Sequence, residues 1–458
     1  MSETITARMS RWATQLQFDQ LTAEAIREAK RYLLDSLGCA LGGYQQHDVE
    51  IALEVLEATG GEGPSTVIGT GKRMDPVSAS LLNALMVRVM DYNDIYWQQD
   101  PSHPSDIIPA ALACGERTGR SGADLIVGIV LGHEFEMRLC EAAFPGIRER
   151  GWHHATLTAF VSPMVAAKML DLDWEQMQHA IGISGSRMAT LGAVTAGKLT
   201  MMKNTVDPMA TQSGVLAALL AERGYTGPEH VIDGKEGLVH CMGPEWKLEI
   251  LEAGLGDGFR ITQCGMKAFP TEALTHAPIS CTLDLIKDND LEPDQVEKVH
   301  IRSLGRAADI LADPSKYDPR SKETADHSLP YVIAAAVAER QVTPVQFTDE
   351  KIMDPTIRAQ LNKVEVVADP EIEALFPELQ RVIVKIVTTD GREFEKQIDY
   401  PKGDPRNPLT DQEIEEKFDA LAAPVLSEEQ RAEVKEAVWR LESLETITEL
   451  MRMMGAQD

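Results

Sequence analysis

The 458-residue sequence is poor in aromatic residues and in positive charge, and both deficits limit what it can do. Aromatic residues make up only 5%, so the apolar residues are mainly aliphatic, a mixture that favours helices over sheets. There are 44 Lys and Arg against 72 Asp and Glu, a formal net charge of -28. Such a chain lacks the basic surface that nucleic acid or an anionic membrane requires, so we expect neither partner.

Cysteine motifs, long apolar segments and phosphate-binding loops are also missing. The six cysteines lie far apart without a C-x-x-C pair, so we expect buried thiols and neither a zinc nor an iron–sulfur site. The most apolar stretch, residues 123–132, is far shorter than the ~20 residues that span a bilayer. The polar N-terminus does not resemble a secretory signal, which predicts a cytoplasmic protein or a processed matrix protein. The glycine-rich pieces match neither the dinucleotide fingerprint nor the P-loop.

What is present over the first 260 residues is one helical pattern after another. Residues 22–41 place Ile26, Leu33 and Leu37 on one face and end at a Gly-Gly pair. Asp75 followed by proline predicts a capped helix that runs to about Met90. Only residues 65–68 resemble a strand here. Further helices are predicted over residues 123–138, 156–170, 174–183 and 209–223.

The pattern changes near residue 265. Short β-branched or alternating runs appear there, and a Thr-Thr-Asp-Gly segment at 388–391 predicts a hairpin between the last two. From residue 410 the chain is helical again. We therefore predict a mainly α protein, in which residues 1–264 and 403–458 form a large helical domain and residues 265–402 form an inserted, smaller α+β domain. The β-branched or alternating runs are residues 296–302, 363–367, 381–387 and 393–398, and helices are predicted at residues 328–339 and 349–361.

The densest polar cluster in an apolar setting is DYNDIYWQQDPSHPSD, residues 91–106. It directly follows a strongly apolar helix and contains Asp91, Asn93 and His103. Connections of this composition are often functional, because a rigid helix holds their acid–base groups in place. The structural alternative is that Asp94 and Ser105 only cap helices. Both interpretations are open from the residues alone.

A second cluster, GWHHAT at residues 151–156, also precedes an apolar helix. A helix N-terminus lowers the pKa of a histidine and attracts an anion, so one of His153 and His154 could face a cavity while the other faces solvent. Alternatively, they are surface histidines beside a capping Thr156. Lys198 and Lys203, among small and apolar residues, could anchor a carboxylate, although lysines often extend from such stretches to solvent.

Two further junctions lie in the predicted α+β region. The first contains Lys267, Glu272 and His276, and His276 could equally be a core histidine at a helix start. The second contains Asp326 and His327 before a predicted helix. Several such junctions predict one concave site with acids, histidines and lysines, which fits proton transfer on a small anionic molecule. Because the net charge is negative, the site must gather its own cations.

Taken together, these segments resemble the 2-methylcitrate dehydratase family, often written MmgE/PrpD, whose relatives include cis-aconitate decarboxylase and an iminodisuccinate epimerase. No single motif is specific, but the ordered set spans about residues 30–340. The resemblance implies a helical domain from both chain ends with an inserted α+β domain, usually in a homodimer. The matching segments are RYLLDSLGCALGG (31–43), DYNDIYW…HPSD (91–106), GWHHAT (151–156), MMKNTVDPMATQSGVLAALLAERGYTGP (201–228), MKAFPTEALTHAPI (266–279) and TADHSLPY (324–331).

Because the residues offer no metal-ligand cluster and no phosphate-binding loop, we expect an active site without a metal or a cofactor. Two features of the sequence bear on the reaction. Asp91 and His103 are twelve residues apart, as in the dehydratase branch. Ile95 stands where many members carry threonine, and TADHSLPY differs from the DRDHC-x-QY form of 2-methylcitrate dehydratases. The expected catalytic residues are Asp91, His103, His153, Lys203 and His276, and the expected substrate-binding residues are Lys267, Tyr331 and Asn93.

We therefore expect a hydro-lyase that eliminates water from a 2-hydroxy polycarboxylate such as 2-methylcitrate or citrate. A base, His103 or Asp91, would remove a proton beside a carboxylate. Lys203 and Lys267 would hold carboxylates and stabilise the charge that develops.

A second histidine, His153 or His276, would then protonate the departing hydroxyl. The same groups could decarboxylate cis-aconitate or epimerise a substituted succinate, because all three reactions pass through a related carbanion-like species. The non-enzyme alternative is a carboxylate-binding member of the family without turnover.

Overall fold

The computed structural model describes residues 3–97, 100–196, 199–243, 245–376 and 378–455. Helices account for 58% of the chain and strands for 9%, which confirms the mainly α prediction. The chain forms two compact units. The helical unit comprises Met1–Val89, Asn93–Cys264 and Thr410–Asp458, and the α+β unit comprises Met90–Tyr92 and Gly265–Leu409.

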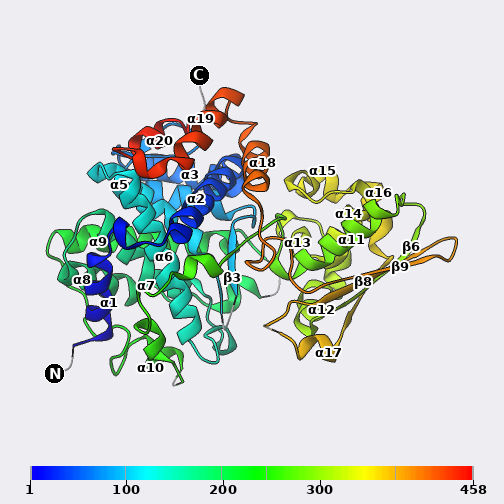
Figure 1. Ribbon diagram of the computed structural model, residues 1–458, viewed down its shortest axis with the longest axis horizontal. Helices are drawn as coiled ribbons and strands as arrows, with labels where there is room; N and C mark the ends of the chain where they lie inside the picture. The colour runs from blue at the N-terminus through cyan, green and yellow to red at the C-terminus, as the bar shows by residue number, and fades with distance from the viewer. Residues whose placement is uncertain (1–2, 98–99, 197–198, 244, 377, 456–458) are drawn as a thin grey trace. The chain divides into compact units, whose positions relative to one another are not determined.

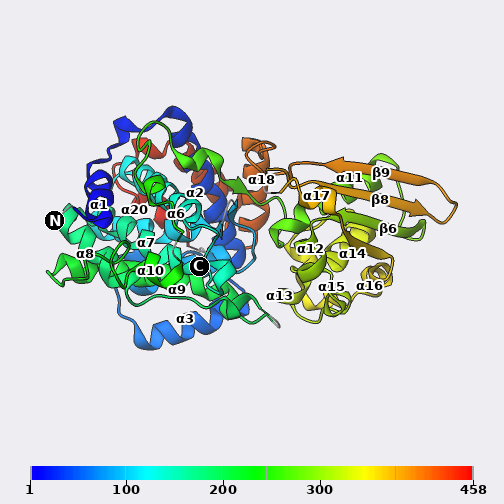
Figure 2. The same cartoon turned by 90° about the horizontal axis from the view of Figure 1, so that it is seen from below.

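The helical unit contains residues from both ends of the sequence. Figures 1 and 2 show α18, near the C-terminus, beside α2, near the N-terminus. Its short strands form two small ladders, β1 with β2 and β3 with β4. Its helices are α1 (Ile5–Gln15), α2 (Ala23–Gly43), α3 (His47–Thr59), α4 (Pro76–Arg88), α5 (Ile108–Thr118), α6 (Gly122–Ala142), α7 (Ala155–Met169), α8 (Trp174–Gly185), α9 (Met202–Glu222), α10 (Leu238–Met242), α18 (Asp411–Ala422), α19 (Glu428–Trp439) and α20 (Thr448–Arg452); its strands are β1 (Ser65–Thr66), β2 (Arg73–Met74), β3 (Asp94–Trp97) and β4 (Pro101–Ser102).

Small residues and a buried ion pair join α18 to α2. A Cβ at Gly38 would lie 3.2 Å from the Cα of Phe418, a tight contact, so a glycine at this position favours the close approach of the two helices. Nearby, the Lys417 ammonium lies 2.6 Å from the Asp35 carboxylate, and both side chains are buried. Removing either partner would leave an uncompensated buried charge, which is strongly destabilising.

Two apolar helices, α7 and α9, pack closely at the centre of the helical unit. Almost every side chain of α7 is buried, so this helix has no solvent-facing side. A Cβ at Gly214 of α9 would lie 2.2 Å from the Ser162 hydroxyl of α7, so the contact requires a glycine at this position. The close approach brings the residues at the start of α7 near those of the first turns of α9.

The α+β unit contains a four-stranded sheet in the order β7-β6-β8-β9. β6 pairs with β7 in parallel, and the other two pairs are antiparallel. Figure 1 shows α11 and α14 on one side of β8 and β9. The elements are β5 (Gly265–Met266), α11 (His276–Asp288), β6 (Val296–Ser303), α12 (Gly305–Leu311), α13 (Lys322–Ala325), α14 (Leu329–Glu339), α15 (Asp349–Ile352), α16 (Pro355–Leu361), β7 (Val364–Ala368), α17 (Pro370–Glu373), β8 (Val382–Thr388) and β9 (Glu393–Ile398).

The predicted polar connection at residues 91–106 contains a pair of short strands that the sequence did not predict. β3 and β4 form an antiparallel pair in which Tyr96 faces Ser102. The suggested role of Ser105 as a cap of the following helix is wrong. Ser105 lies in a 3-10 turn (Pro104–Ile107), and its hydroxyl and its backbone N–H donate to the Asp94 carboxylate at 2.6 and 2.9 Å.

The suggested cap at Thr156 is also wrong. α7 begins at Ala155, and the Thr156 hydroxyl accepts a hydrogen bond from the Thr190 N–H at 2.9 Å. In contrast, the predicted cap at Asp75 is confirmed, since its carboxylate accepts from the N–H groups of Val77 and Ser78. No helix in the described parts of the chain combines the length and the apolarity needed to cross a membrane.

Candidate functional site

His103 in the helical unit is held in one tautomer. Its Nδ1 lies 2.6 Å from the backbone oxygen of Asp94. A carbonyl oxygen can only accept, so we assign the hydrogen to Nδ1, and the neutral ring then carries its lone pair on Nε2. The Asp94 carboxylate itself is held by Ser105, which fixes the β3 segment that orients His103.

His153 has the opposite arrangement. The backbone N–H of Ala155 donates to its Nδ1 at 3.2 Å, so in the neutral ring Nε2 carries the hydrogen. Burial lowers the pKa of His153 well below its ordinary value of 6.5, and the neighbouring His154 lowers it further. His153 is therefore a neutral hydrogen-bond donor at physiological pH.

His154 completes a group of three histidines. Its ring centroid lies 3.9 Å from that of His153 and 5.3 Å from that of His103. His154 Nε2 lies 3.3 Å from the carboxylate of Asp207, which projects from α9. The sequence offered His154 only as the neighbour of His153, and it gave no signal for Asp207, because 53 residues separate the two.

Two buried acids beside these histidines differ in protonation. Burial raises the pKa of Asp207, but the charge of His154, the hydrogen bond to it and the charge of Arg88 outweigh burial and hold the pKa below its usual range. Burial raises the pKa of Asp106 well above its usual value, although Arg88 opposes this. The Arg88 Nε lies 3.5 Å from Asp106 and 3.9 Å from Asp207. Asp207 is therefore the ionised acid that faces His154.

A third buried acid, Glu136 of α6, joins the two histidine-bearing segments. Its Oε1 accepts hydrogen bonds from Ser102, next to His103, at 2.5 Å and from Thr158 of α7 at 2.8 Å. Burial raises the pKa of Glu136 to about 8. The carboxyl group is thus mostly neutral at pH 7.

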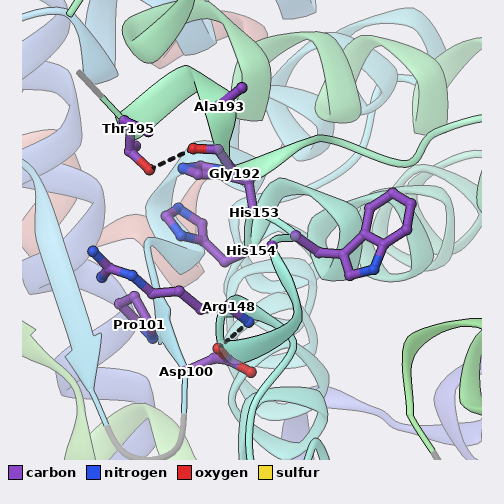
Figure 3. A pocket seen from close by; sticks show the side chains of 11 residues that line it. Asp100, Pro101, Arg148, His153, His154, Gly192, Ala193 and Thr195 are labelled. Atoms are coloured by element: carbon purple, nitrogen blue, oxygen red, sulfur yellow. Dashed lines mark hydrogen bonds between the residues drawn. The ribbon is translucent and has the colours of Figure 1, made fainter. Parts of the chain in front are cut away.

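A pocket of about 410 Å³ is lined by two of these histidines, His153 and His154. Figure 3 shows Arg148, His154 and Thr195 around it, with Asp100 near the backbone of Arg148. All of its lining residues belong to the helical unit. They are Asp100, Pro101, Arg148, Gly151, Trp152, His153, His154, Gly192, Ala193, Thr195 and Ala196.

The other two predicted residues of the helical unit are also buried. Lys203 is the second residue of α9. The Asn93 side-chain amide donates to Ser105 and Asp106, each at 3.0 Å. This contact braces the turn after His103. Lys198 lies outside the described residues.

Asp91 and Lys267 form a buried ion pair in the α+β unit. The Lys267 ammonium donates to the Asp91 carboxylate at 2.8 Å and to the backbone oxygens of Asp91 and Thr271. Asp91 has a φ of 52°, a left-handed conformation that is rare for a residue other than glycine. Such conformations concentrate at functional sites.

His276 and Tyr331 lie in the same unit as this ion pair. His276 is the first residue of α11, and its Nε2 lies 3.3 Å from the Thr271 oxygen, which also accepts from Lys267. Tyr331 is fully buried, its hydroxyl donates to the Gln346 carbonyl, and its ring packs near Phe347. The roles in substrate binding expected of Tyr331 and Asn93 stay predictions.

Two groups of buried side chains in the helical unit have donor atoms within 4.8 Å of one another, close enough to surround a cation. They are Asp94, His133 and Cys264, and His153, His154 and Asp207. The contacts within them are those of ordinary polar clusters: Cys264 Sγ lies 3.7 Å from Asp94, and His154 lies 3.3 Å from Asp207. We interpret both groups as hydrogen-bonded or ion-paired clusters.

Comparisons with known proteins identify the family to which this sequence is similar. The chain matches the MmgE/PrpD N-terminal domain over residues 7–251 and the MmgE/PrpD C-terminal domain over residues 269–443. It is 26% identical to a cis-aconitate decarboxylase-like protein of Aspergillus oryzae, covering 99% of this chain and 98% of that protein.

Two other relatives carry names of enzymes. A human cis-aconitate decarboxylase is 27% identical, over 96% of this chain and 92% of the relative. A 2-methylcitrate dehydratase of Salmonella typhi is 24% identical, over 84% of each. The two domain matches together extend over most of the sequence. This chain therefore belongs to the MmgE/PrpD family.

Proposed function

We propose that this chain is a lyase that acts on a small polycarboxylate by general acid–base catalysis, without a metal or a cofactor. The observation that carries the proposal is the group of His103, His153 and His154, of which His153 and His154 line a pocket that also has Arg148 on its wall. Imidazoles exchange protons near neutral pH, and a guanidinium holds a carboxylate. These are the two abilities that the reaction requires.

The tautomers suggest a division of roles between two of the histidines. His103 offers the lone pair of Nε2 and is our candidate for the base that removes a proton beside a carboxylate. His153 is neutral and offers an Nε2–H, so it can donate to a departing hydroxyl or to a developing negative charge. The two rings thus offer a proton acceptor and a proton donor, the combination that an acid–base pair requires.

The remaining predicted residues keep the roles that the family resemblance implies. We propose that Lys203 and Lys267 hold carboxylates and that Asp91 and His276 take part in proton transfer. Each role is tested by its own substitution. Lys203 belongs to the helical unit, and Lys267, Asp91 and His276 belong to the α+β unit. We further propose that the chain is a homodimer, which light scattering after size-exclusion chromatography will check.

Two reactions compete for this site. Dehydration of a 2-hydroxy polycarboxylate, such as 2-methylcitrate or citrate, is supported by the twelve-residue step from Asp91 to His103. Decarboxylation of a cis-aconitate-like substrate is the second candidate. It is supported by the relatives named as cis-aconitate decarboxylases, which align with 96–99% of this chain, whereas the Salmonella dehydratase aligns with 84%.

The deciding experiment is product analysis by mass spectrometry after separate incubation with 2-methylcitrate, citrate and cis-aconitate. Loss of water from a hydroxy acid identifies a dehydratase, and loss of carbon dioxide from cis-aconitate identifies a decarboxylase. An epimerase would exchange a carbon-bound proton in heavy water without a change of composition. Thermal stabilisation by these ligands without any turnover would contradict the proposal and support a binding protein.

A further inference from the structure

One buried carboxyl group lies behind the three histidines of the helical unit. Glu136 is completely buried on α6, and its Oε1 accepts hydrogen bonds from the hydroxyls of Ser102 at 2.5 Å and Thr158 at 2.8 Å. Glu136 is not among the described residues that line the pocket. Its effect on the pocket therefore passes through the two residues that it binds.

Each of these two residues leads directly to a histidine. Ser102 is the residue before His103 in the chain. Thr158 lies in the first turns of α7, and its backbone N–H donates to the His154 carbonyl at 3.3 Å. The His103 and His154 rings lie 5.3 Å apart, measured between their centroids. Glu136 thus joins the two segments whose rings meet, and a shift of either hydroxyl would shift one ring relative to the other.

The helix that carries Glu136 is a firm base for this bridge. α6 is 21 residues long, and most of its side chains are buried. It also holds the β3–β4 pair at a second place, since Glu141 accepts a hydrogen bond from the Tyr96 hydroxyl at 2.7 Å. A Cβ at Gly132 of α6 would lie 3.4 Å from the Val165 side chain of α7, so these two helices are in close contact. Both ends of the bridge are therefore held against the same helix.

The chemistry of the carboxyl group suits a bridge between two hydroxyls. Burial raises the pKa of Glu136 to about 8, so the group is mostly neutral at pH 7. Its other oxygen, Oε2, is buried and has no hydrogen-bond partner among the described residues, which disfavours a charge there. With the hydrogen on Oε2, Oε1 is a carbonyl oxygen with two lone pairs, one for each hydroxyl. A glutamine amide oxygen could accept the same two bonds, whereas leucine could accept neither.

We infer that Glu136 is a positioning residue of the proposed lyase: by binding Ser102 and Thr158 through one oxygen, it fixes the separation of the His103 and His154 rings. The inference rests on the proposed function, because these rings belong to the group that carries it. The role requires no particular charge on either histidine and no contact between Glu136 and the substrate. A carboxyl group that only satisfied two hydroxyls would affect folding and leave turnover unchanged.

The first test compares variants by steady-state kinetics at pH 7, with 2-methylcitrate, citrate and cis-aconitate as substrates. Glu136→Leu removes the acceptor of both hydrogen bonds, and Glu136→Gln keeps an acceptor at the same place. The control is Ser162→Ala, which removes a buried hydroxyl from the helix that carries Thr158. That hydroxyl donates to the Ala210 carbonyl at 2.9 Å and not to Glu136.

We expect Glu136→Leu to lower kcat roughly 10- to 100-fold, the size of loss that follows when catalytic groups are misplaced. KM should change little, because Glu136 touches no substrate. Glu136→Gln should keep most of the turnover, and Ser162→Ala should lower stability but not kcat. Equal losses in Glu136→Leu and Ser162→Ala, or equal losses in Glu136→Leu and Glu136→Gln, would overturn the inference.

A double-mutant cycle tests whether Glu136 acts through His103. In a chain that already carries His103→Ala, Glu136→Leu should lower the remaining turnover less than about 3-fold, because the ring that it positions is gone. The same loss with and without His103 would overturn the inference. Circular dichroism confirms that each variant is folded. Should Glu136→Leu unfold, Ser102→Ala takes its place in both experiments, because it removes the hydrogen bond beside His103 and leaves Glu136 intact.

A third measurement needs no substrate, so the inference and the lyase can fail separately. The His103 Nδ1 hydrogen, which is bonded to the Asp94 carbonyl, is followed by ¹⁵N NMR of the histidine-labelled full chain. Its signal is the one that His103→Ala removes. Its exchange with solvent should quicken roughly 10-fold or more in Glu136→Leu and stay unchanged in Ser162→Ala.

The outcomes distinguish the two proposals. Faster exchange in Glu136→Leu, without turnover of any of the three acids by the unaltered chain, would leave the positioning role standing and overturn the lyase. Turnover by the unaltered chain, with the same kcat and the same exchange rate in Glu136→Leu, would leave the lyase standing and overturn the positioning role.

Discussion

Glu136 makes the stability of the helical unit depend on pH. Burial raises its pKa from 4.5 to about 8, although the hydrogen bonds from Ser102 and Thr158 lower it. A carboxyl group whose pKa is higher in the folded chain than in the unfolded chain binds its proton more tightly when folded. Its contribution to stability is therefore complete below pH 4.5 and is lost as the pH rises through about 8.

The two pKa values set the size of this effect. One pKa unit corresponds to about 1.4 kcal/mol, so a rise from 4.5 to about 8 corresponds to about 5 kcal/mol over the whole titration. Between pH 5 and pH 8 the linkage relation gives a loss of about 3.5 kcal/mol. Glu136→Gln preserves the shape of the side chain but does not titrate. We therefore expect the stability of the unaltered chain to fall by that amount relative to the variant.

The assay is urea unfolding at several pH values between 5 and 8, followed by tryptophan fluorescence. This signal is specific, because all six tryptophans belong to the helical unit. Other titrating groups contribute equally to both proteins and cancel in the difference. If both proteins lose stability in parallel, Glu136 is ionised in the folded chain and the reasoning is wrong. The tryptophans are Trp12, Trp97, Trp152, Trp174, Trp246 and Trp439.

Three further predictions follow from the site and from the packing. His103→Ala should lower turnover roughly 10²- to 10⁴-fold if the ring is the base, whereas His47→Ala, at an exposed position on α3, should not; equal turnover would remove His103 from the mechanism. Prolonged dialysis against EDTA should leave turnover unchanged, and a loss that an added metal restores would contradict metal-independent catalysis. Gly214→Ala should destabilise the chain by about 1–3 kcal/mol, because the new Cβ would meet Ser162 at 2.2 Å. Gly61→Ala, with nothing within 4 Å, is the control, and equal melting temperatures would refute the packing argument.

The regular elements could be predicted because their patterns are local. The run 393–398 is β9 to the residue, since alternation along a strand is visible in the sequence itself. The β3–β4 pair was not predicted. Its strands have four and two residues, and one of them begins with a proline, so they are too short for a pattern to emerge.

The extent of the α+β unit differs from the predicted insertion at residues 265–402. The unit continues to Leu409 and also includes Met90–Tyr92. The C-terminal difference has a simple cause, because the Met266 N–H donates to the Gly403 oxygen at 2.9 Å. Such a contact joins residues that are distant in sequence, and no local pattern reports it.

The sequence by itself determined the helical character, the strands of the inserted region and the segments in which the candidate residues lie. These features depend on neighbours three or four residues away in a helix, or two away in a strand. Only the tertiary structure decided which side chains meet. It paired His154 with Asp207 and placed Arg148 in the wall of the same pocket. It also assigned Asp91 to the α+β unit, where Asp91 pairs with Lys267, and His103 to the helical unit. These side-chain contacts depend on the close approach of helices such as α7 and α9. Residues far apart in the chain make that approach possible.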